Sequence, residues 1–452
     1  MEARPAAWRW QTGVGRWTRL LASEDFLWLV GIIALAVLLR AIWVAYAVVD
    51  PTDGRLDDSV FYHQMGAMLA RGEGYNSPWS GLPTAQWPPG YPFFLTGLYF
   101  LFGPTVLGAK LANVFLGAAT CALVYAAGLH IFDRWSARLG AALLAVFPGQ
   151  IMFSSTLYSE TVFTFLFWAG VLATVVLARR QPAAVGPWLA LGVLFAAAAF
   201  VREVALALPV IALLYWGLSK VGWRRALRWT ALALVGMAAL ILPWSLRNYL
   251  AMDAFVLLSS SAGSNFWVGH HEGAKGGEPF SQLVELNNQY GPLTRPGGEI
   301  DISQNGLRDG LKFMATHPGD ELRFVGLKLR DLYKQDTAGL VLNEWGGLRA
   351  FLTDSVRSAL EVLINAFYFA VLALAGLALF HWLRLKGRGP VMPLVVIAVV
   401  TAGHVLFFAN TRFHFPVMPA FCLLAGWGVI STVRAARASS LRRAMETSGP
   451  AG

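Results

Sequence analysis

Residues 26–49 read FLWLVGIIALAVLLRAIWVAYAVV, an apolar run in which Arg40 is the only charged residue. A helix over this run can cross a bilayer, because about 20 apolar residues span the hydrocarbon core. Similar runs recur along the chain and predict about ten transmembrane helices. The predicted spans are 26–49, 105–131, 138–153, 160–178, 186–201, 204–219, 226–245, 358–383, 391–408 and 415–433. The runs at 138–153 and 186–201 are short, so we expect them to be broken or tilted.

The composition of the whole chain also indicates a membrane protein. Of its 452 residues, 56% are hydrophobic and 14% are charged, whereas soluble domains carry about 25% charged residues. This excludes a disordered chain and an ordinary cytosolic enzyme. Cys121 and Cys422 lie in apolar stretches, which indicates core residues rather than a disulfide framework. Long unbroken runs favour helices over an outer-membrane barrel, so the predicted fold class is an all-α polytopic membrane protein.

The distribution of basic residues predicts the orientation of the chain. Nineteen of the 36 Lys and Arg residues lie in the N-terminal segment, alternate short loops and the C-terminal tail. Since cytoplasmic loops collect Lys and Arg, we expect both termini in the cytoplasm and the protein in the cytoplasmic (inner) membrane. No small-residue cleavage site follows the first span, so no cleaved signal peptide is expected. The net charge of +10 reflects these loops and predicts no nucleic-acid partner.

Two longer segments are expected on the outer side of the membrane. The first includes an apolar stretch at 91–103 that is too short to cross and is expected to lie at the interface. The second is polar and is expected to have mixed structure. The predicted organisation is a cytoplasmic N-terminus at 1–25, a transmembrane module at 26–246 with an outer loop at 50–104, an extracytoplasmic segment at 247–357, C-terminal transmembrane helices at 358–433 and a basic cytoplasmic tail at 434–452.

An acidic pair opens the first outer segment. Asp57 and Asp58 precede apolar residues at helical spacing, so they stand at the N-terminus of an expected surface helix. Helix capping explains one aspartate. A pair beside a membrane surface also suits catalysis, and the residues alone leave both interpretations open.

Other ionisable residues gather on the same predicted side. Glu160 begins the fourth span, and Arg202-Glu203 stands between two spans with no loop around it. The candidate cations are Lys110, Arg202, Arg247 and Arg412, with Arg40 deeper in the first span. Single cations at a membrane face also bind lipid head groups, and Arg202-Glu203 equally fits a self-neutralising ion pair. Several cations converging with carboxylates would suit a phosphate-bearing substrate.

Common catalytic and cofactor motifs are absent from the sequence. It contains no GxxxxGK[ST], HExxH, CxxC or GxSxG pattern. The sequence therefore indicates no particular cofactor. A divalent metal is compatible with the residues, but no ligand cluster indicates one. The side chains of His270 and His271 are expected to point apart, which favours loop histidines over a metal pair and leaves a sugar or phosphate contact by His270 as the alternative.

A series of short motifs resembles the membrane glycosyltransferases of the GT-C fold. The resemblance is nearest to bacterial family-39-like enzymes related to protein O-mannosyltransferases and aminoarabinose transferases. The motifs are, in order, Asp57-Asp58 with Tyr62, Arg71-Gly72-Glu73-Gly74-Tyr75, Pro88-Pro89-Gly90-Tyr91-Pro92, Leu157-Tyr158-Ser159-Glu160, Val201-Arg202-Glu203, Pro243-Trp244-Ser245-Leu246-Arg247-Asn248-Tyr249, Asn265-Phe266-Trp267-Val268-Gly269-His270-His271, His317-Pro318 and Arg412-Phe413-His414-Phe415-Pro416. Their order and topological positions cover most of the chain.

The resemblance implies transfer of a sugar from a polyprenyl-phosphate donor to an acceptor hydroxyl of a protein, lipid or glycan at the outer face. It implies that Asp58, four residues before Tyr62, is the catalytic base, with Asp57 as second choice and Glu160 as the second acid. The implied contacts of the substrate and the lipid phosphate are Arg202, Arg247, Arg412, Lys110, Tyr62, Tyr91 and His270. Relatives often carry Lys before the paired prolines, where this chain has Gln86 and Trp87.

Two other functional classes share some of these features. A transporter or flippase of lipid-linked sugars would have the spans and the phosphate contacts, with charged or broken helices near the midplane. It has no need of a catalytic acid on an outer surface helix. A receptor or scaffold that binds through 247–357 explains that segment but not the outer carboxylates. The gathering of carboxylates on the outer side therefore favours an enzyme.

Overall fold

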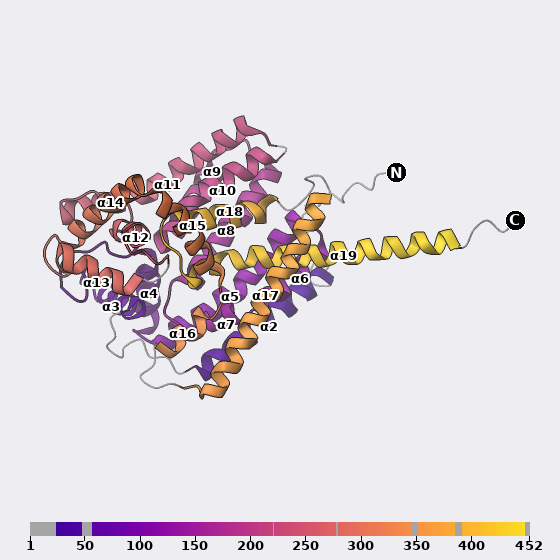
Figure 1. Ribbon diagram of the computed structural model, residues 1–452, viewed down its shortest axis with the longest axis horizontal. Coiled ribbons are helices and arrows are strands. Elements are labelled where there is room, and N and C mark those ends of the chain that lie inside the picture. Colours follow the sequence, from indigo (N-terminus) through magenta and orange to yellow (C-terminus); the bar gives the residue numbers. More distant parts are fainter. Residues whose placement is uncertain are drawn as a thin grey trace.

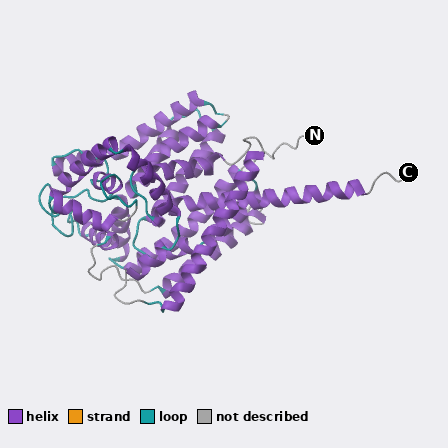
Figure 2. Cartoon of the chain, in the orientation of Figure 1, coloured by secondary structure: helices purple, strands orange, loops and turns teal. Residues whose placement is uncertain are grey.

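The structure, a computed structural model, describes residues 24–47, 57–219, 221–276, 279–345, 351–384 and 391–447. Over these residues the chain is helical, with loops between the helices and no strand (Figure 2). The predicted N-terminal segment up to residue 23 and the tail beyond residue 447 lie outside the described residues. The predicted all-α fold class is confirmed.

Several helices of the described chain are long and apolar enough to cross a membrane. They are α2 (Glu24–Tyr46), α5 (Val106–Ile131), α8 (Glu160–Arg180), α11 (Trp223–Met252), α17 (Asp354–Arg384) and the stretch Thr411–Leu441, which joins η3 (Thr411–Val417) to α19 (Met418–Thr447). A further crossing is formed if α6 (Arg134–Ala145), α7 (Pro148–Met152) and η1 (Phe153–Ser155), bent by 52°, count as one span. The chain is a multi-pass membrane protein.

The predicted count of ten crossings is not confirmed. The remaining apolar helices are short: α4 (Gly90–Phe102), α9 (Gly186–Val201), η2 (Glu203–Ala207) with α10 (Leu208–Leu218), and α18 (Val391–Leu406). A helix of 16 residues such as α9 is about 24 Å long, less than the ~30 Å of a hydrocarbon core. Within the described residues, all ten predicted runs are mainly helical, but helix length alone does not make each of them a crossing.

The bend between α6 and α7 accommodates the buried charge of the first span. Phe147 is extended before Pro148, which begins α7, as expected because proline disfavours a helical residue before it. The break frees carbonyls at the end of α6, and Arg40 Nη1 donates to one of them, Ala145 O, at 3.1 Å. Gly117 leaves room for the guanidinium, since a Cβ there would lie 2.6 Å from Arg40 Nε.

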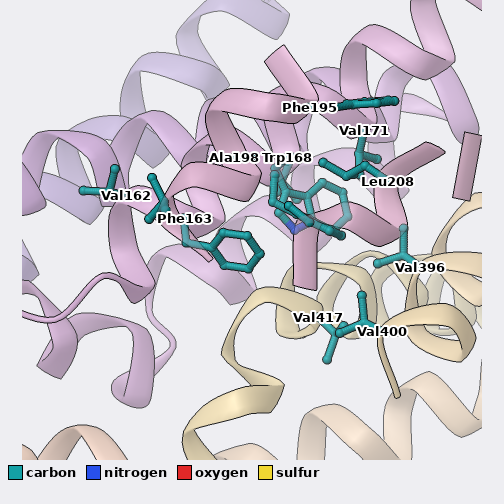
Figure 3. Packing of buried hydrophobic residues seen from close by; sticks show 14 of the residues in the cluster. Val162, Phe163, Trp168, Val171, Phe195, Ala198, Leu208, Val396, Val400 and Val417 are labelled. Atoms are coloured by element: carbon teal, nitrogen blue, oxygen red, sulfur yellow. The ribbon is translucent and has the colours of Figure 1, made fainter. Parts of the chain in front are cut away.

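Glycines bring α9 and α11 into close contact. A Cβ on Gly192 would lie 1.8 Å from Ala233 O, and one on Gly236 would lie 2.1 Å from Leu189 O. Close backbone approach through small residues is the usual way in which membrane helices associate. Beside this contact, Trp168 and Val171 of α8 pack with Phe195 of α9, Leu208 of α10 and residues of α18 in the core of the bundle (Figure 3).

The polar segment 247–357 is folded as helices in its described part, rather than with the mixed structure expected. Its helices are α12 (Ser261–Gly269), α13 (Pro279–Tyr290), α14 (Gly298–Thr316), α15 (Pro318–Tyr333) and α16 (Ala338–Trp345). The preceding helix α11 continues to Met252, past the predicted boundary at 246. Figure 1 shows α12, α13 and α14 at the left of the molecule, with α4 and the outer-loop helix α3 (Asp58–Ala70).

Basic residues meet at the opposite end of the bundle. Arg138 bonds to Glu24 and Asp25 at 2.8 Å, and Arg434 bonds to Asp133 at 2.8 Å. Arg179 donates to His130 O. We call this the basic end, and the end with α3, the start of α8 and η3 the site end. The described residues Arg138, Arg179 and Arg434, from three of the basic segments, therefore share one end of the bundle.

Candidate functional site

Asp57 caps the outer-loop helix. Its Oδ1 accepts from Val60 N at 3.0 Å, which satisfies one orphan backbone donor of the first turn of α3, and from Ser59 Oγ at 2.7 Å. The hydroxyl of Tyr158 donates to its other oxygen at 3.3 Å. The capping interpretation of the acidic pair thus applies to Asp57, whereas the side chain of Asp58 is available for other contacts.

Asp58, the first residue of α3, contacts two elements that are distant in sequence. Trp87 Nε1 donates to its Oδ1 at 3.2 Å, and Arg412 Nη2 donates to its Oδ2 at 3.0 Å. The side chain of Asp58 is 28% exposed and that of Arg412 is 23% exposed. Both side chains are thus accessible to solvent, as the predicted catalytic base and its cation would need to be.

Glu160 is the second carboxylate of the site. It begins α8, is 1% exposed, and its Oε1 accepts from Arg202 Nη1 at 2.7 Å and lies 3.9 Å from Arg412 Nε. Its Oε2 is buried without a hydrogen-bond partner. We call Asp57, Asp58, Glu160, Arg202 and Arg412 the acid–arginine cluster. Its formal charge is −1, because three carboxylates face two guanidinium groups.

Each member of the cluster stands at the end of a helix. Arg202 follows the last residue of α9, Glu160 is the first residue of α8, and Arg412 lies in the short helix η3. Aromatic rings cover the cations: Arg412 lies 5.6 Å from the ring of Tyr158, and Arg202 lies 5.3 Å from that of Phe413. Such rings hold guanidinium groups in place without neutralising them.

Buried hydrogen bonds fix η3 and therefore the position of Arg412. Gln150 donates to Phe415 O and Trp168 donates to Pro416 O, both at 2.9 Å. His414 Nδ1 lies 2.6 Å from Leu332 O, and its Nε2 lies 2.8 Å from Asp336 Oδ1. The tip that carries Arg412 is thus bonded to α7, α8 and the end of α15.

Tyr62 and Tyr91 lie beneath the cluster. Their rings meet edge to face with centroids 4.9 Å apart, and they are 5% and 0% exposed. Burial first, and then the charge of Asp58, raise the pKa of Tyr62. Tyr91 packs inside the protein and supports α3, so it has no exposed surface for the predicted substrate contact.

Arg247 makes contacts other than those of the cluster. Its Nη2 donates to Tyr75 O at 2.6 Å and its Nη1 donates to Thr84 O at 2.7 Å. The guanidinium also packs on the ring of Trp244, 5.1 Å away. These bonds tie the loop between α3 and α4 to α11. Within the loop, Tyr75 O accepts only a longer bond, from Thr84 N at 3.5 Å. The structure therefore gives Arg247 the position of a loop anchor.

His270 also lies in a different group. Its Nδ1 is 2.8 Å from Glu321 Oε2, and its Nε2 is 2.8 Å from Leu406 O and 3.1 Å from Lys328 Nζ. Lys328 donates to Val405 O at 3.1 Å. This buried group joins α12 and α15 to the end of α18, and none of its hydrogen bonds reaches the acid–arginine cluster.

Two further predicted cations are placed by α5 and α2. Lys110 is buried one turn before Asn113, whose amide donates to Thr156 O at 2.9 Å, so it lies at the site end. Arg40 binds the helix break described above. Among the described residues, no three His, Cys, Asp or Glu side chains group so as to hold a metal ion, and the compatibility of the site with a divalent metal stays a prediction.

Comparisons with known proteins bear on this arrangement. Residues 86–246 match the sequence model of the dolichyl-phosphate-mannose-protein mannosyltransferase family. The oligosaccharyltransferase of Archaeoglobus fulgidus, in its structure with Zn and sulfate, superimposes with a TM-score of 0.53 and 16% identity, over 92% of this chain and 51% of that one. The chain shares the fold of this oligosaccharyltransferase, the GT-C fold.

Other GT-C structures are similar. The A. fulgidus oligosaccharyltransferase AglB in complex with an inhibitory peptide and a dolichol-phosphate has a TM-score of 0.53 and 15% identity, over 92% of this chain and 52% of that one. ArnT from Cupriavidus metallidurans bound to undecaprenyl phosphate has a TM-score of 0.42 and 18% identity, over 89% and 77%. The chain spans about half the length of the archaeal structures. Among curated proteins, none matches significantly.

The GT-C fold of this chain also includes site residues that the sequence did not single out. Trp87 Nε1 donates to Asp58, and the hydroxyl of Tyr158 donates to Asp57. Tyr158 stands in a motif that carried the resemblance and Trp87 directly precedes one, but an aromatic residue beside Pro or Ser gives no signal for a hydrogen bond to a carboxylate. The matched region 86–246 includes Trp87, Glu160 and Arg202 but neither Asp58 nor Arg412.

Proposed function

We propose that this protein is an integral membrane glycosyltransferase. It transfers a sugar from a polyprenyl-phosphate-linked donor to an acceptor hydroxyl. The observation that carries the proposal is the acid–arginine cluster, in which a quarter-exposed carboxylate, Asp58, and a quarter-exposed cation, Arg412, stand together at one end of the bundle. A sugar phosphate needs both groups, one for the acceptor and one for the leaving group.

Asp58 acts as the base. In the transfer, the acceptor oxygen forms the new bond to the anomeric carbon, its proton goes to Asp58, and the bond from that carbon to the phosphate oxygen breaks. An acceptor hydroxyl is a weak nucleophile until a carboxylate takes its proton. A lipid phosphate on Arg412 would compete with Asp58 for the guanidinium and so leave the carboxylate free to accept that proton.

Arg412 and Arg202 stabilise the departing phosphate. Its charge grows as the bond to the sugar breaks, and one preorganised cationic contact is worth ~3 kcal/mol in the transition state. Glu160 orients both cations, because it bonds to Arg202 at 2.7 Å and lies 3.9 Å from Arg412. Its burial means that it acts through the arginines.

The comparisons support a lipid-phosphate donor. The family model that matches residues 86–246 is named for dolichyl-phosphate-mannose, and a solved structure of the same fold holds a dolichol-phosphate. The transferred sugar is a hexose or a pentose, and the acceptor hydroxyl belongs to a protein, a lipid or a glycan.

A transporter or flippase of lipid-linked sugars is the less favoured function. Such a protein would place its charged groups near the midplane of the helices. Here the carboxylates and their arginines stand at helix ends, and the buried charge of α2, Arg40, binds a helix break at Ala145 O. A receptor or scaffold gives no reason for a base paired with a cation.

The cell envelope is the expected setting. We place the protein in the cytoplasmic (inner) membrane with both termini in the cytoplasm and the cluster on the outer face. The grouping of Arg138, Arg179 and Arg434 at the basic end supports this orientation, since cytoplasmic loops collect such residues.

Substitution of Asp58 tests the proposed function. Asp58→Asn keeps the size of the side chain and an acceptor for Trp87 but removes the base, so turnover should fall by ~10²-fold or more. The assay is transfer from a polyprenyl-phosphate sugar by purified protein in lipid, with membranes of a deletion strain as acceptor; the sugar lost from that strain's envelope selects the donor.

Asp57→Asn is the matched control. Asparagine caps a helix about as well as aspartate, so this variant should lose less activity than Asp58→Asn. Wild-type turnover in Asp58→Asn would refute the assignment of the base. Loss confined to Asp57→Asn would instead assign the base to the neighbouring residue.

A further inference from the structure

A cavity of about 270 Å³ opens at the basic end of the bundle. It lies between the α8–α9 connection and the first turns of α11. Its lining includes Gln181, Trp188, Arg225, Arg228, Trp229 and Leu232. Pockets for drug-sized ligands measure about 300–1,000 Å³, so this cavity suits a smaller group.

The cavity is separate from the acid–arginine cluster. Helix α8 has 21 residues between Glu160 in the cluster and Arg180, next to the cavity residue Gln181. At 1.5 Å per residue the two ends are about 30 Å apart, which matches the thickness of a hydrocarbon core. A group bound in the cavity would therefore lie at the other face of the membrane.

The cavity is lined by two arginines and two tryptophans. Arg225 donates to Gln181 Oε1 at 2.9 Å, and Arg228 follows one turn later on the same face of α11. Trp188 and Trp229 stack with centroids 4.2 Å apart, and the indole of Trp188 donates to Pro182 O at 3.2 Å. Two guanidinium groups recognise an anion with several oxygens, such as a phosphate.

An apolar stripe continues from the cavity along α11. Leu232, Val235 and Leu242 follow Arg228 at the spacing of one helix face. Val235 is 60% exposed and Leu242 is 55% exposed. The stripe runs from the basic end toward the middle of the bundle, where hydrocarbon surrounds the protein. A soluble anion would make no use of it, whereas an acyl chain would cover it.

We propose that this cavity binds the phosphodiester head group of an anionic phospholipid. The phosphate lies between Arg225 and Arg228, the glycerol lies against the tryptophan walls, and an acyl chain follows the α11 stripe. Tryptophan at the membrane interface and basic pockets between helices are both suited to head groups. This site is independent of the proposed transfer reaction.

Lipid retention by the purified full-length protein tests the site. Native mass spectrometry compares phosphatidylglycerol with phosphatidylcholine on the wild type and on Arg225→Gln/Arg228→Gln. Each charge-assisted hydrogen bond to the phosphate is worth about tenfold or more in affinity, so the double variant should hold phosphatidylglycerol about 100-fold less tightly. Phosphatidylcholine retention should not change.

Arg224→Gln/Arg437→Gln is the matched control, because it removes the same charge from exposed positions outside the cavity lining. It should retain phosphatidylglycerol as the wild type does. Equal losses in the two double variants, or no loss in either, would overturn the site. Inorganic phosphate should not displace the lipid; displacement at millimolar phosphate would show a site for soluble anions and overturn the lipid assignment.

Discussion

Arg412 is shared between two carboxylates of different exposure. It lies 3.0 Å from the accessible Asp58 and 3.9 Å from the buried Glu160. Burying Glu160 without a cation would be costly, and Arg202 at 2.7 Å already meets that need. Arg412 can therefore change its partner from Asp58 to a phosphate without leaving the buried acid unpaired.

Arg412 and Arg247 should respond differently to the same substitution. Arg412→Gln should lower transfer about 10²-fold, the usual cost of one preorganised transition-state contact, with little change in thermal stability. Arg247→Gln should lower the melting temperature, because Thr84 O loses the Arg247 donor and Tyr75 O keeps only the long bond from Thr84 N; an unsatisfied buried group costs ~1–3 kcal/mol. The measurements are melting curves and transfer rates of both variants. Loss of transfer in Arg247→Gln with loss of thermal stability in Arg412→Gln would instead assign Arg247 to the phosphate.

Lys328 should make stability depend on pH. Burial lowers its pKa to about 8, while in the unfolded chain it stays near 10.4. Folding thus disfavours the charged lysine: the destabilisation is complete below pH 8 and disappears as pH rises toward 10.4. Relative to Lys328→Met, which has no such group, the wild type should gain thermal stability between about pH 8 and 10. A pH-independent difference between their melting temperatures would contradict this.

The sequence located the site by side of the membrane rather than by contact. Alternation of basic loops placed Asp58, Glu160, Arg202 and Arg412 on one side, and the structure brings these four together. The same rule also selected Arg247, whose bonds go to a loop instead. A charge pattern predicts where along the bundle axis a residue lies. It does not predict toward which neighbour the side chain points, because that depends on how the helices pack.

At the scale of elements, η3 connects the site to the core. Gln150 and Trp168 donate hydrogen bonds to backbone carbonyls of η3. His414, a residue of η3, is almost fully buried and contacts Asp336. Gly149 leaves the space for that carboxylate, since a Cβ there would lie 2.0 Å from Asp336 Oδ2. The tip with Arg412 is therefore rigid, which suits a preorganised cation.

The contact between α9 and α11 should tolerate no added methyl group. Gly192→Ala and Gly236→Ala would each place a Cβ within 2.1 Å of a backbone carbonyl of the facing helix, and a backbone cannot move as a side chain can. Overpacking costs ~1–3 kcal/mol, so both variants should melt at lower temperature in detergent.

Gly31→Ala is the control for this contact. Gly31 lies in α2 with nothing within 4 Å of a built Cβ. Replacing a helical glycine by alanine in open space stabilises by ~0.4–1 kcal/mol through the unfolded chain. Unchanged melting of Gly192→Ala and Gly236→Ala beside this control would mean that the helices are not in close contact.

Apolar runs predicted every bundle helix but not how many cross the membrane. A run such as 186–201 has the composition of a span and the length of a buried helix, and hydropathy does not separate the two. The break in 138–153 was expected from its length and lies before Pro148, where local chemistry stops a helix. The helices of 247–357 are amphipathic rather than apolar all round, so no apolar run indicates them.

Across the whole molecule, charge is divided between two ends. The site end holds a cluster with formal charge −1. At the basic end, four arginines (Arg138, Arg179, Arg225 and Arg434) face three carboxylates (Glu24, Asp25 and Asp133), which gives a formal charge of +1. The membrane potential and anionic lipids both act on such a division. The donor phosphate would bind arginines beside the start of α8, and the lipid head group would bind arginines beside the end of the same helix.

The orientation of this division can be measured with single cysteines. Cys121 and Cys422 are fully buried, so the native protein gives little background with an impermeant thiol reagent. Asn288→Cys, exposed on α13 beside the site end, should be labelled in intact cells. Arg224→Cys, exposed at the basic end, should be labelled only after the membrane is permeabilised. The reason is the positive-inside distribution of the loops. The opposite pattern would place the acid–arginine cluster on the cytoplasmic face and the α11 cavity outside.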